Sequence, residues 1–198
     1  MRKIFFAISI FSVTSCASNY QPVASQFINF QNEVVENDII FSFRYDVLKE
    51  QGNKKYTKKE STKNIKIVAI KVTNNSSEDF IFGQDKHVYS GNNSISLLEP
   101  EFVFTQLRQP VPVYLLYLLL TPMQLTVTKG GTTNSKPIGL VIGPGITAIN
   151  MGVSASANAK FKTELYLTFL NNKTIKAGET VNGLIGIAES GYNPLSLK

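Results

Sequence analysis

Two segments of the chain alternate between apolar and polar residues, which is the pattern of β-strands. Residues 38–48 alternate from residue 40 onward, so we expect a half-buried strand there. Its apolar side is formed by Phe41, Phe43, Tyr45 and Val47. Residues 64–75 carry apolar side chains on both sides, which predicts a central, largely covered strand. The highly charged residues 49–63 between these segments are expected to form a long hairpin or loop.

Shorter apolar stretches separated by turn residues follow the second strand. We expect strands at residues 79–83, 86–90 and 94–98, with a turn at residues 91–93 because Gly and Asn tolerate positive φ. Several short strands at this spacing are typical of a β-sandwich.

Residues 99–170 interrupt the strand pattern and predict a helical insertion. Residues 109–128 carry no charge, and their leucine-rich centre is bounded by prolines. Proline suits the first turn of a helix and its end, so we expect a short helix over about residues 113–121. Residues 154–170 predict a further helix, because apolar residues recur there every four positions.

A second uncharged stretch, residues 137–159, follows the polar residues 129–136, which are expected to form a flexible turn. Gly139 and Gly143 have the spacing that lets two helices approach closely in lipid. The two uncharged stretches have three interpretations: packing on the open face of the sandwich, shallow membrane contact or self-association, and full membrane spanning. Spanning would need about twenty predominantly apolar helical residues in each segment. The candidate contact residues are Tyr114, Leu115, Tyr117, Leu118, Gly139, Gly143 and Gly145.

The N-terminus carries the strongest local motif. Met1, Arg2 and Lys3 precede an apolar run, which is typical of a secretory signal peptide. The run has about ten residues, too few to cross roughly 30 Å of hydrocarbon. The sequence Val13-Thr14-Ser15-Cys16 resembles the lipobox of bacterial lipoproteins. This resemblance implies that Cys16 is the lipidated (palmitate-bearing) first residue of the mature chain. An ordinary signal peptide with a chance cysteine is the alternative.

The same resemblance implies a location and a domain organisation. No aspartate and no acidic cluster follow Cys16, which in the Gram-negative sorting scheme favours the outer membrane and its periplasmic side. We therefore expect a signal peptide at residues 1–15, a lipidated N-terminus and tether at residues 16–37, and a single domain at residues 38–198.

The composition fits a folded, exported domain. Hydrophobic residues make up 43% of the chain and charged residues 17%, so the chain is globular and not disordered. Cys16 is the only cysteine, so no internal disulfide holds the domain. Part of the formal charge of +6 leaves with the signal peptide, and much of the remainder lies in residues 49–66. That run is either a solvated face or a docking patch for anionic lipid headgroups. No nucleic-acid recognition motif is present.

Three further segments carry a second resemblance: KVTNN at residues 71–75, DFIFG at residues 79–83 and IKAGETVNGLIGI at residues 175–187. They resemble the immunoglobulin-like domains of small bacterial lipoproteins of unassigned function, over roughly residues 38–98 and 164–198. The resemblance implies a mainly β fold of the α+β class: an immunoglobulin-like β-sandwich interrupted by a hydrophobic helical segment. It also implies a turn at Lys176 to Glu179 that leads into a strand over residues 180–188. It implies no catalytic residues. The chain has no Trp, which argues against an antibody-type domain.

The sequence offers little for catalysis or for cofactor or metal binding. His87 is the only histidine, and a metal site usually needs several converging ligands. The densest acidic group is Asp79, Asp85, Glu99 and Glu101, for which solvation is the simplest role. We therefore expect a non-enzymatic, lipid-anchored envelope protein that acts as a binding or structural module. The alternatives are a membrane-active or self-associating protein that uses the hydrophobic hairpin 111–157, and a hydrolase built around His87.

Overall fold

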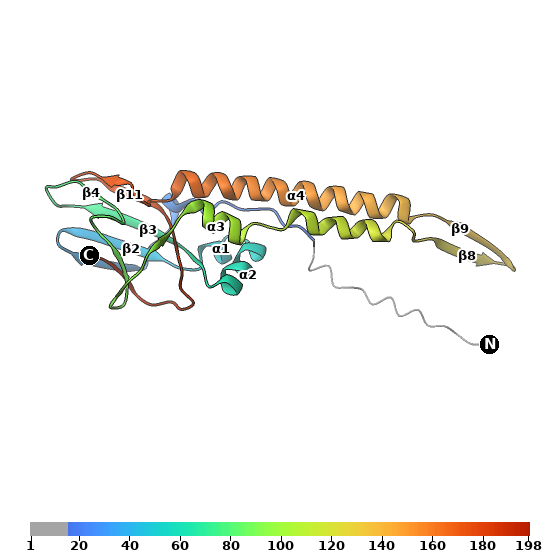
Figure 1. Ribbon diagram of the computed structural model, residues 1–198, viewed down its shortest axis with the longest axis horizontal. Coiled ribbons are helices and arrows are strands. Elements are labelled where there is room, and N and C mark those ends of the chain that lie inside the picture. The colour runs from blue at the N-terminus through green and yellow to red at the C-terminus, as the bar shows by residue number, and fades with distance from the viewer. Residues whose placement is uncertain (1–15) are drawn as a thin grey trace.

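The computed structural model describes residues 16–198, so the signal peptide and most of the lipobox lie outside the described residues. The chain is a mixed α+β protein, which confirms the α+β class (Figure 1). The expectation of a mainly β fold is wrong, because helices account for at least as much of the chain as strands do. The strands are β1 (Asn32–Glu36), β2 (Ile39–Arg44), β3 (Lys66–Asn74), β4 (Phe80–Ile81), β5 (Val88–Ser90), β6 (Asn93–Ser94), β7 (Leu97–Leu98), β8 (Leu125–Lys129), β9 (Thr132–Lys136), β10 (Thr174–Ile175), β11 (Thr180–Ile187) and β12 (Leu195–Leu197). The α-helices are α1 (Val47–Glu50), α2 (Lys54–Lys63), α3 (Pro100–Leu107) and α4 (Gly139–Thr168), and the 3-10 helices are η1 (Ser25–Phe27) and η2 (Val111–Leu120).

A five-stranded antiparallel sheet with the order β1-β2-β3-β11-β7 forms the centre of the protein. The predictions of strands within residues 38–48 and 64–75 and of a strand at residues 180–188 are confirmed by β2, β3 and β11. In β3, Val68 and Ile70 contribute to one core and Ile67 and Ala69 to another. The prediction of a central strand covered on both faces is therefore confirmed, because successive side chains of a strand point to opposite faces.

Short strands supply the core on one face of this sheet. The pair β10-β4 and the three-stranded sheet β12-β5-β6 contribute Phe80, Ile175, Val88 and Leu195 to a core shared with the central strands. The predicted turn that leads into β11 is present, with Gly178 at a φ of 76°.

Helices cover the other face. Side chains from α1, α2, α3 and the C-terminal half of α4 form a second core with the central sheet, and its buried aromatic residues are Tyr20, Tyr56, Phe104 and Phe161. The sheet therefore lies between a layer of short strands and a layer of helices.

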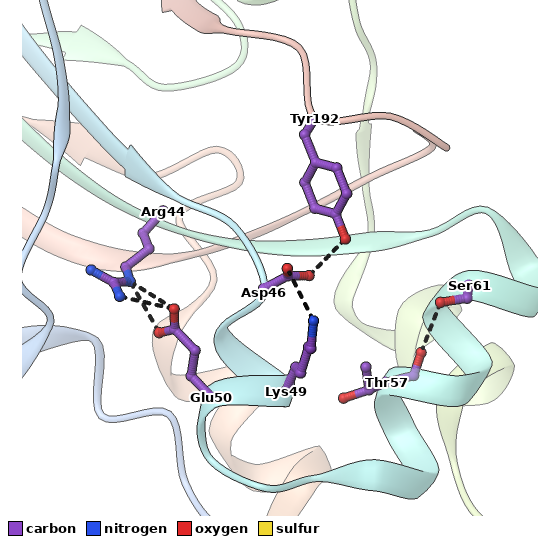
Figure 2. Close-up of polar contacts among 7 residues, drawn as sticks. All are labelled: Arg44, Asp46, Lys49, Glu50, Thr57, Ser61 and Tyr192. Carbon is purple, nitrogen blue, oxygen red and sulfur yellow. Dashed lines mark hydrogen bonds and ion pairs between the residues drawn. The ribbon is translucent and has the colours of Figure 1, made fainter.

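The prediction of a hairpin or loop at residues 49–63 is wrong, because the segment forms α1 and α2. Tyr56 and Glu60 lie one helical turn apart and are both buried, so the many lysines of this segment are the solvent-facing part of an amphipathic helix. Salt bridges fix α1 at the end of β2 (Figure 2): Arg44 pairs with Glu50 at 2.8 Å, and Asp46 pairs with Lys49 at 4.0 Å.

The expectation of a tether after Cys16 is also wrong for residues 17–25, which pack against the helical layer. Tyr20 is 2% exposed, and its ring centroid lies 5.1 Å from those of both Tyr56 and Phe161. The carboxylate of Glu164 accepts hydrogen bonds from the Tyr20 hydroxyl and from the Val23 amide. In a solvated tether, these two donors would form hydrogen bonds with water. Here they bond to Glu164, so this segment is part of the folded body.

Two predictions within the insertion need correction. Residues 129–136 belong to the strands β8 and β9 instead of a flexible turn, with only Gly130 and Gly131 between them. The helix predicted from residue 154 begins at Gly139, because the chain continues as a helix through Pro144. The short helix predicted at about residues 113–121 is present as η2.

Candidate functional site

A long arm extends from the folded body and is the most unusual feature of the protein. We define the arm as residues 111–149, which comprise η2, the β8–β9 hairpin and the first part of α4 (Figure 1). We call the remainder of the described chain the body. Figure 1 shows η2 and α4 running side by side away from the sheet, with the hairpin at the far end. The interpretation in which the uncharged stretches pack on a sheet face is therefore wrong for the arm. Within residues 137–159 only Ala157 belongs to the apolar core of the body, and the core residues Phe161 and Leu165 of α4 lie beyond that stretch.

The length of the arm is close to the thickness of a bilayer. At about 1.5 Å per residue, the helical part from Gly139 to Asn150 is about 17 Å long. The hairpin adds about 16 Å at roughly 3.3 Å per residue. The sum compares with about 30 Å for the hydrocarbon core of a typical membrane.

The buried face of α4 changes character along the helix. In the body it is mainly apolar, with Ala157, Phe161 and Leu165 beside the single polar residue Asn158. From Ser154 towards the arm tip, the buried residues are small or polar: Gly139, Gly143, Thr147, Asn150 and Ser154. The outer face of the same segment is apolar and exposed, with Val141 at 76% and Ile149 at 68% exposure. The helical part of the arm therefore places its small and polar groups inside and its apolar groups outside, whereas the polar side chains of the hairpin are exposed.

Close backbone contact explains the glycines on the inner face. A Cβ atom on Gly139 would lie 2.2 Å from the Leu120 carbonyl oxygen, and one on Gly143 would lie 3.0 Å from the Tyr117 carbonyl oxygen. The expected close approach at Gly139 and Gly143 is therefore present, between α4 and η2 of the same chain. Gly145 does not share this role, since a Cβ there would meet no atom within 4 Å.

Hydrogen bonds also join the two sides of the arm. The Thr147 hydroxyl donates to the carbonyl oxygen of Tyr114 at 3.2 Å, and the Gly139 amide donates to the carbonyl oxygen of Met123 at 2.9 Å. Small residues and hydroxyl-to-carbonyl bonds at an interface are how helices associate in lipid, where apolar side chains give no net attraction between them.

The predicted contact residues of η2 fall into two groups. Tyr114 is buried against α4 and Tyr117 is half-buried, so both help to hold the arm together. Leu115 and Leu118 point outward and are 47% and 42% exposed, and their neighbour Leu119 is 75% exposed. The arm is apolar on its outward surfaces along both η2 and α4, unlike an amphipathic helix that docks through one stripe.

Charged residues of the arm are confined to its hairpin. Lys129 and Lys136, both in the hairpin, are the only charged residues between Arg108 and Lys160. By length and composition α4 is apolar enough to cross a membrane, and only 28% of its most apolar stretch is buried within the protein. A core helix of similar composition would be mostly covered.

A polar network fixes the arm to the body; we call its members, Ser18, Tyr56, Gln109, Asn150 and Asn158, the neck. The Asn158 side chain accepts a hydrogen bond from the backbone amide of Gln109 at 2.8 Å and donates one to the backbone carbonyl of Gln109 at 2.9 Å. The Gln109 side chain also accepts a hydrogen bond from the backbone amide of Ser18 and donates one to the Ser18 carbonyl oxygen. Because Gln109 and Asn158 are buried and their hydrogen-bonding groups are satisfied, the arm leaves the body in a defined direction.

Cys16 lies directly beside the neck. The amide of the next residue, Ala17, donates to the Asn150 side-chain oxygen at 2.7 Å. The position of the predicted lipid anchor is therefore fixed at the root of the arm, with no flexible spacer between them.

Basic side chains surround this root. Lys59 donates to the carbonyl oxygen of Arg108, and burial lowers the pKa of Lys59, with a further contribution from the charges of Lys63 and Arg108. Burial also lowers the pKa of Lys55, and nearby Cys16 acts in the opposite direction. We call Lys55, Lys59 and Arg108 the collar. Its positive charge lies at the level of the predicted anchor, where anionic lipid headgroups would be.

The remaining candidates for chemistry do not form a catalytic group. The His87 side chain is exposed and lines an open hollow with Ser94, Ser96, Glu99 and Asn171, but among residues 16–198 no hydrogen bond joins its ring to a serine or a carboxylate. The acidic residues serve separate local roles: Asp85 accepts from the Ile81 amide, Asp79 from the Ala177 amide, and Glu101 pairs with Lys162. In the described part of the chain, no three His, Cys, Asp or Glu residues group as metal ligands.

Comparison with known proteins gives no match to a family model, a curated protein or a solved structure.

Sequence reasoning missed the neck and the place of Arg108 in the collar, whereas Lys55 and Lys59 lie in the basic run 49–66 that it offered as a possible docking patch for lipid headgroups. Gln109 and Asn158 are uncharged residues far apart in the sequence, so no local pattern marks them as partners. The inner stripe of α4 was partly readable: Gly139, Gly143, Thr147, Asn150 and Ser154 follow helical spacing and are all small or polar.

Proposed function

We propose that this protein is a lipid-anchored envelope protein that inserts its arm into the membrane holding its anchor. The observation that carries the proposal is the reversed polarity of the arm, with small and polar groups inside and apolar groups outside. This arrangement is unfavourable in water, where contiguous exposed apolar surface of this size marks an interaction site. It is favourable in lipid, where the inner polar groups satisfy one another and the outer groups meet acyl chains.

The choice of lipid over a protein partner rests on the shape of the apolar surface. A protein partner covers one side of a helix, whereas the arm presents apolar side chains outward from both η2 and α4. The anchor, the collar and the root of the arm lie together, so acyl chains and arm would enter the same leaflet. We place the protein at the outer membrane on the periplasmic side, with the body remaining in the periplasm.

The body is proposed to be a variation of the immunoglobulin-like sandwich, with a helical layer on the face opposite the short strands. In this proposal the protein acts by contact, as a binding or structural module, and it has no substrate, cofactor or metal.

Vesicle flotation tests insertion separately from anchoring. The chain from residue 16 onward, carrying Cys16→Ser, is mixed with vesicles of phosphatidylethanolamine and phosphatidylglycerol. We expect it to float with the vesicles, and to stop floating when Leu115, Leu119, Val141 and Ile149 are all replaced by Ser. The matched control replaces four exposed apolar residues of the body by Ser: Phe27, Val35, Phe102 and Leu167. Equal flotation of the arm and body variants would overturn the insertion proposal.

The anchor has its own test. Metabolic labelling with a fatty acid is expected to mark the native chain and not the Cys16→Ser variant. Label retained by the variant would contradict lipidation at Cys16 and leave the flotation result unaffected.

A further inference from the structure

The β8–β9 hairpin at the arm tip has edges that nothing in the described chain covers. Every residue of both strands is exposed, and among residues 16–198 the two strands pair only with each other. A single two-stranded hairpin is marginally stable in water. Its outer edges present unpaired N–H and C=O groups, which are a template for another strand.

The hairpin nevertheless has a defined geometry. Gly130 and Gly131 have φ angles of 56° and 83°, as the tight turns preferred in hairpins require. The register is continuous from Leu125 opposite Lys136 to Lys129 opposite Thr132. Neither strand contains proline, so no residue blocks pairing at either edge.

The two faces of the hairpin differ chemically. One face carries hydroxyl groups from Thr126, Thr128, Thr133 and Ser135, and the hydroxyls of Thr128 and Thr133 lie 3.1 Å apart. The other face carries Leu125 and Val127 on β8, together with Lys129, Thr132, Asn134 and Lys136. A shared sheet built from several hairpins would therefore gather the hydroxyl rows on one side.

The proposed function makes the open edges costly, and the inference rests on it. With the neck at the membrane surface, the hairpin begins roughly 20 Å deep, by helix rise and strand rise. Hydrocarbon offers no water to an open strand edge, so its backbone groups need protein partners.

We infer that these partners are second copies of this chain, with β9 of one copy pairing with β8 of the next. Anchors and arms enter from one side, so all the arms run in the same direction. Two β8 strands would then be parallel, whereas β9 against the next β8 is antiparallel, like the pair within one hairpin. Antiparallel pairing is slightly more stable per residue. Because this contact joins two different edges, its repetition closes a ring when the rotation permits.

Disulfide cross-linking tests this pairing in vesicles. Two versions of the full lipidated chain are prepared with different epitope tags, one carrying Thr126→Cys on β8 and the other Ser135→Cys on β9. Each chain has one added thiol, so no cross-link forms within a hairpin. We expect mixed dimers on oxidation, in several-fold excess over dimers of either version alone. Equivalent strands of neighbouring copies would lie about 10 Å apart, with another strand between them, whereas a disulfide needs Cα atoms within about 7 Å.

Two controls separate the inference from the proposed function. A chain without an added cysteine tests whether Cys16 itself cross-links, and Gly152→Cys places a thiol on α4 near the neck, outside the hairpin. An environment-sensitive dye on Leu119→Cys reports insertion independently. Mixed dimers together with a dye that reports hydrocarbon surroundings support both insertion of the arm and pairing between copies. A buried dye with no cross-link, or with dimers of one version only, overturns the copy-to-copy pairing and leaves insertion standing. A dye that stays in water overturns insertion, and the pairing inference falls with it.

Discussion

The two halves of α4 obey opposite rules within one continuous helix. In the body half, Phe161 and Leu165 are completely buried and charged residues such as Lys160 face solvent. In the arm half, Gly143 and Thr147 are buried while Val141 and Ile149 face outward. The first pattern is that of a helix folded in water, and the second is that of a helix folded in lipid.

In the proposed arrangement, the surroundings of each half of α4 decide which of its faces is buried. Judged by overall hydrophobicity alone, the whole of α4 would be taken as one candidate membrane-spanning helix. The buried residues of α4 change from mainly apolar to small or polar near Ser154, which lies next to the neck and Cys16. In the proposed arrangement, this position is the boundary between water and membrane. The predictions below test whether this division is real.

The largest expected effect is a contrast in stability between the two halves. Phe161→Ala empties a fully buried site between Tyr20 and Tyr56, so it should reduce the free energy of unfolding by about 3–5 kcal/mol. Val141→Ala changes an exposed residue in the arm half of α4 and should cost less than about 0.5 kcal/mol in water. Urea denaturation of the Cys16→Ser chain measures both. Similar costs would contradict the division of α4.

The stability of the body should depend on pH between about 4 and 7. The arm contains no acidic residue or histidine, so no side chain of the arm titrates in this range. Burial raises the pKa of Glu60 to about 7, although the Ile67 amide donates to its carboxylate at 2.8 Å and partly opposes the shift. A raised pKa means that the folded state binds the proton more tightly than the unfolded state does. Stability should therefore fall by roughly 3 kcal/mol as pH rises from about 4.5 to 7.

Glu60→Gln tests this effect, because the amide keeps an acceptor oxygen for Ile67 and does not titrate. We expect the decline in stability between pH 4.5 and 7 to shrink in the variant, as measured by denaturation at several pH values. An unchanged decline would show that another group causes it.

Glycine substitutions should separate the inner and outer faces of α4. Gly139→Ala places a methyl group against the Leu120 carbonyl and should destabilise packing of the arm by about 1–3 kcal/mol. Gly152→Ala has open space and should be neutral or stabilising by up to about 1 kcal/mol, since alanine favours helix. Hydrogen exchange in η2 reports the result: faster exchange is expected only for Gly139→Ala. Equal exchange in both variants would mean that the close contact does not hold η2.

The collar should have the smallest effect. Lys55→Gln and Lys59→Gln each remove one positive charge near the anchor and should weaken binding to anionic vesicles by about 1 kcal/mol, or about fivefold. Lys173→Gln, in the body beyond the C-terminal end of α4, is the matched control and should change nothing. The difference should disappear in vesicles without anionic lipid. An equal loss for Lys173→Gln would indicate a general charge effect.

The sequence was informative where a local pattern decides the structure. Alternation located β2 and β3, the resemblance to immunoglobulin-like domains located β11, and proline-bounded leucines located η2. It failed where packing at a distance decides: the lysines of α2 hid a helix whose buried face is only Tyr56 and Glu60. The lack of charge marked the arm, but its direction could not be predicted, because the neck that sets it joins residues far apart in the sequence.

One comparison tests the central claim most directly. Leu119 in the arm and Leu167 in the body half of α4 are 75% and 79% exposed, so cysteines at these positions carry a dye in similar surroundings in water. On binding to vesicles, the dye at position 119 should shift to the emission of hydrocarbon and be quenched by lipids labelled deep in the acyl chain, while the dye at position 167 keeps its aqueous emission. Identical aqueous emission at both positions on bound protein would contradict the account.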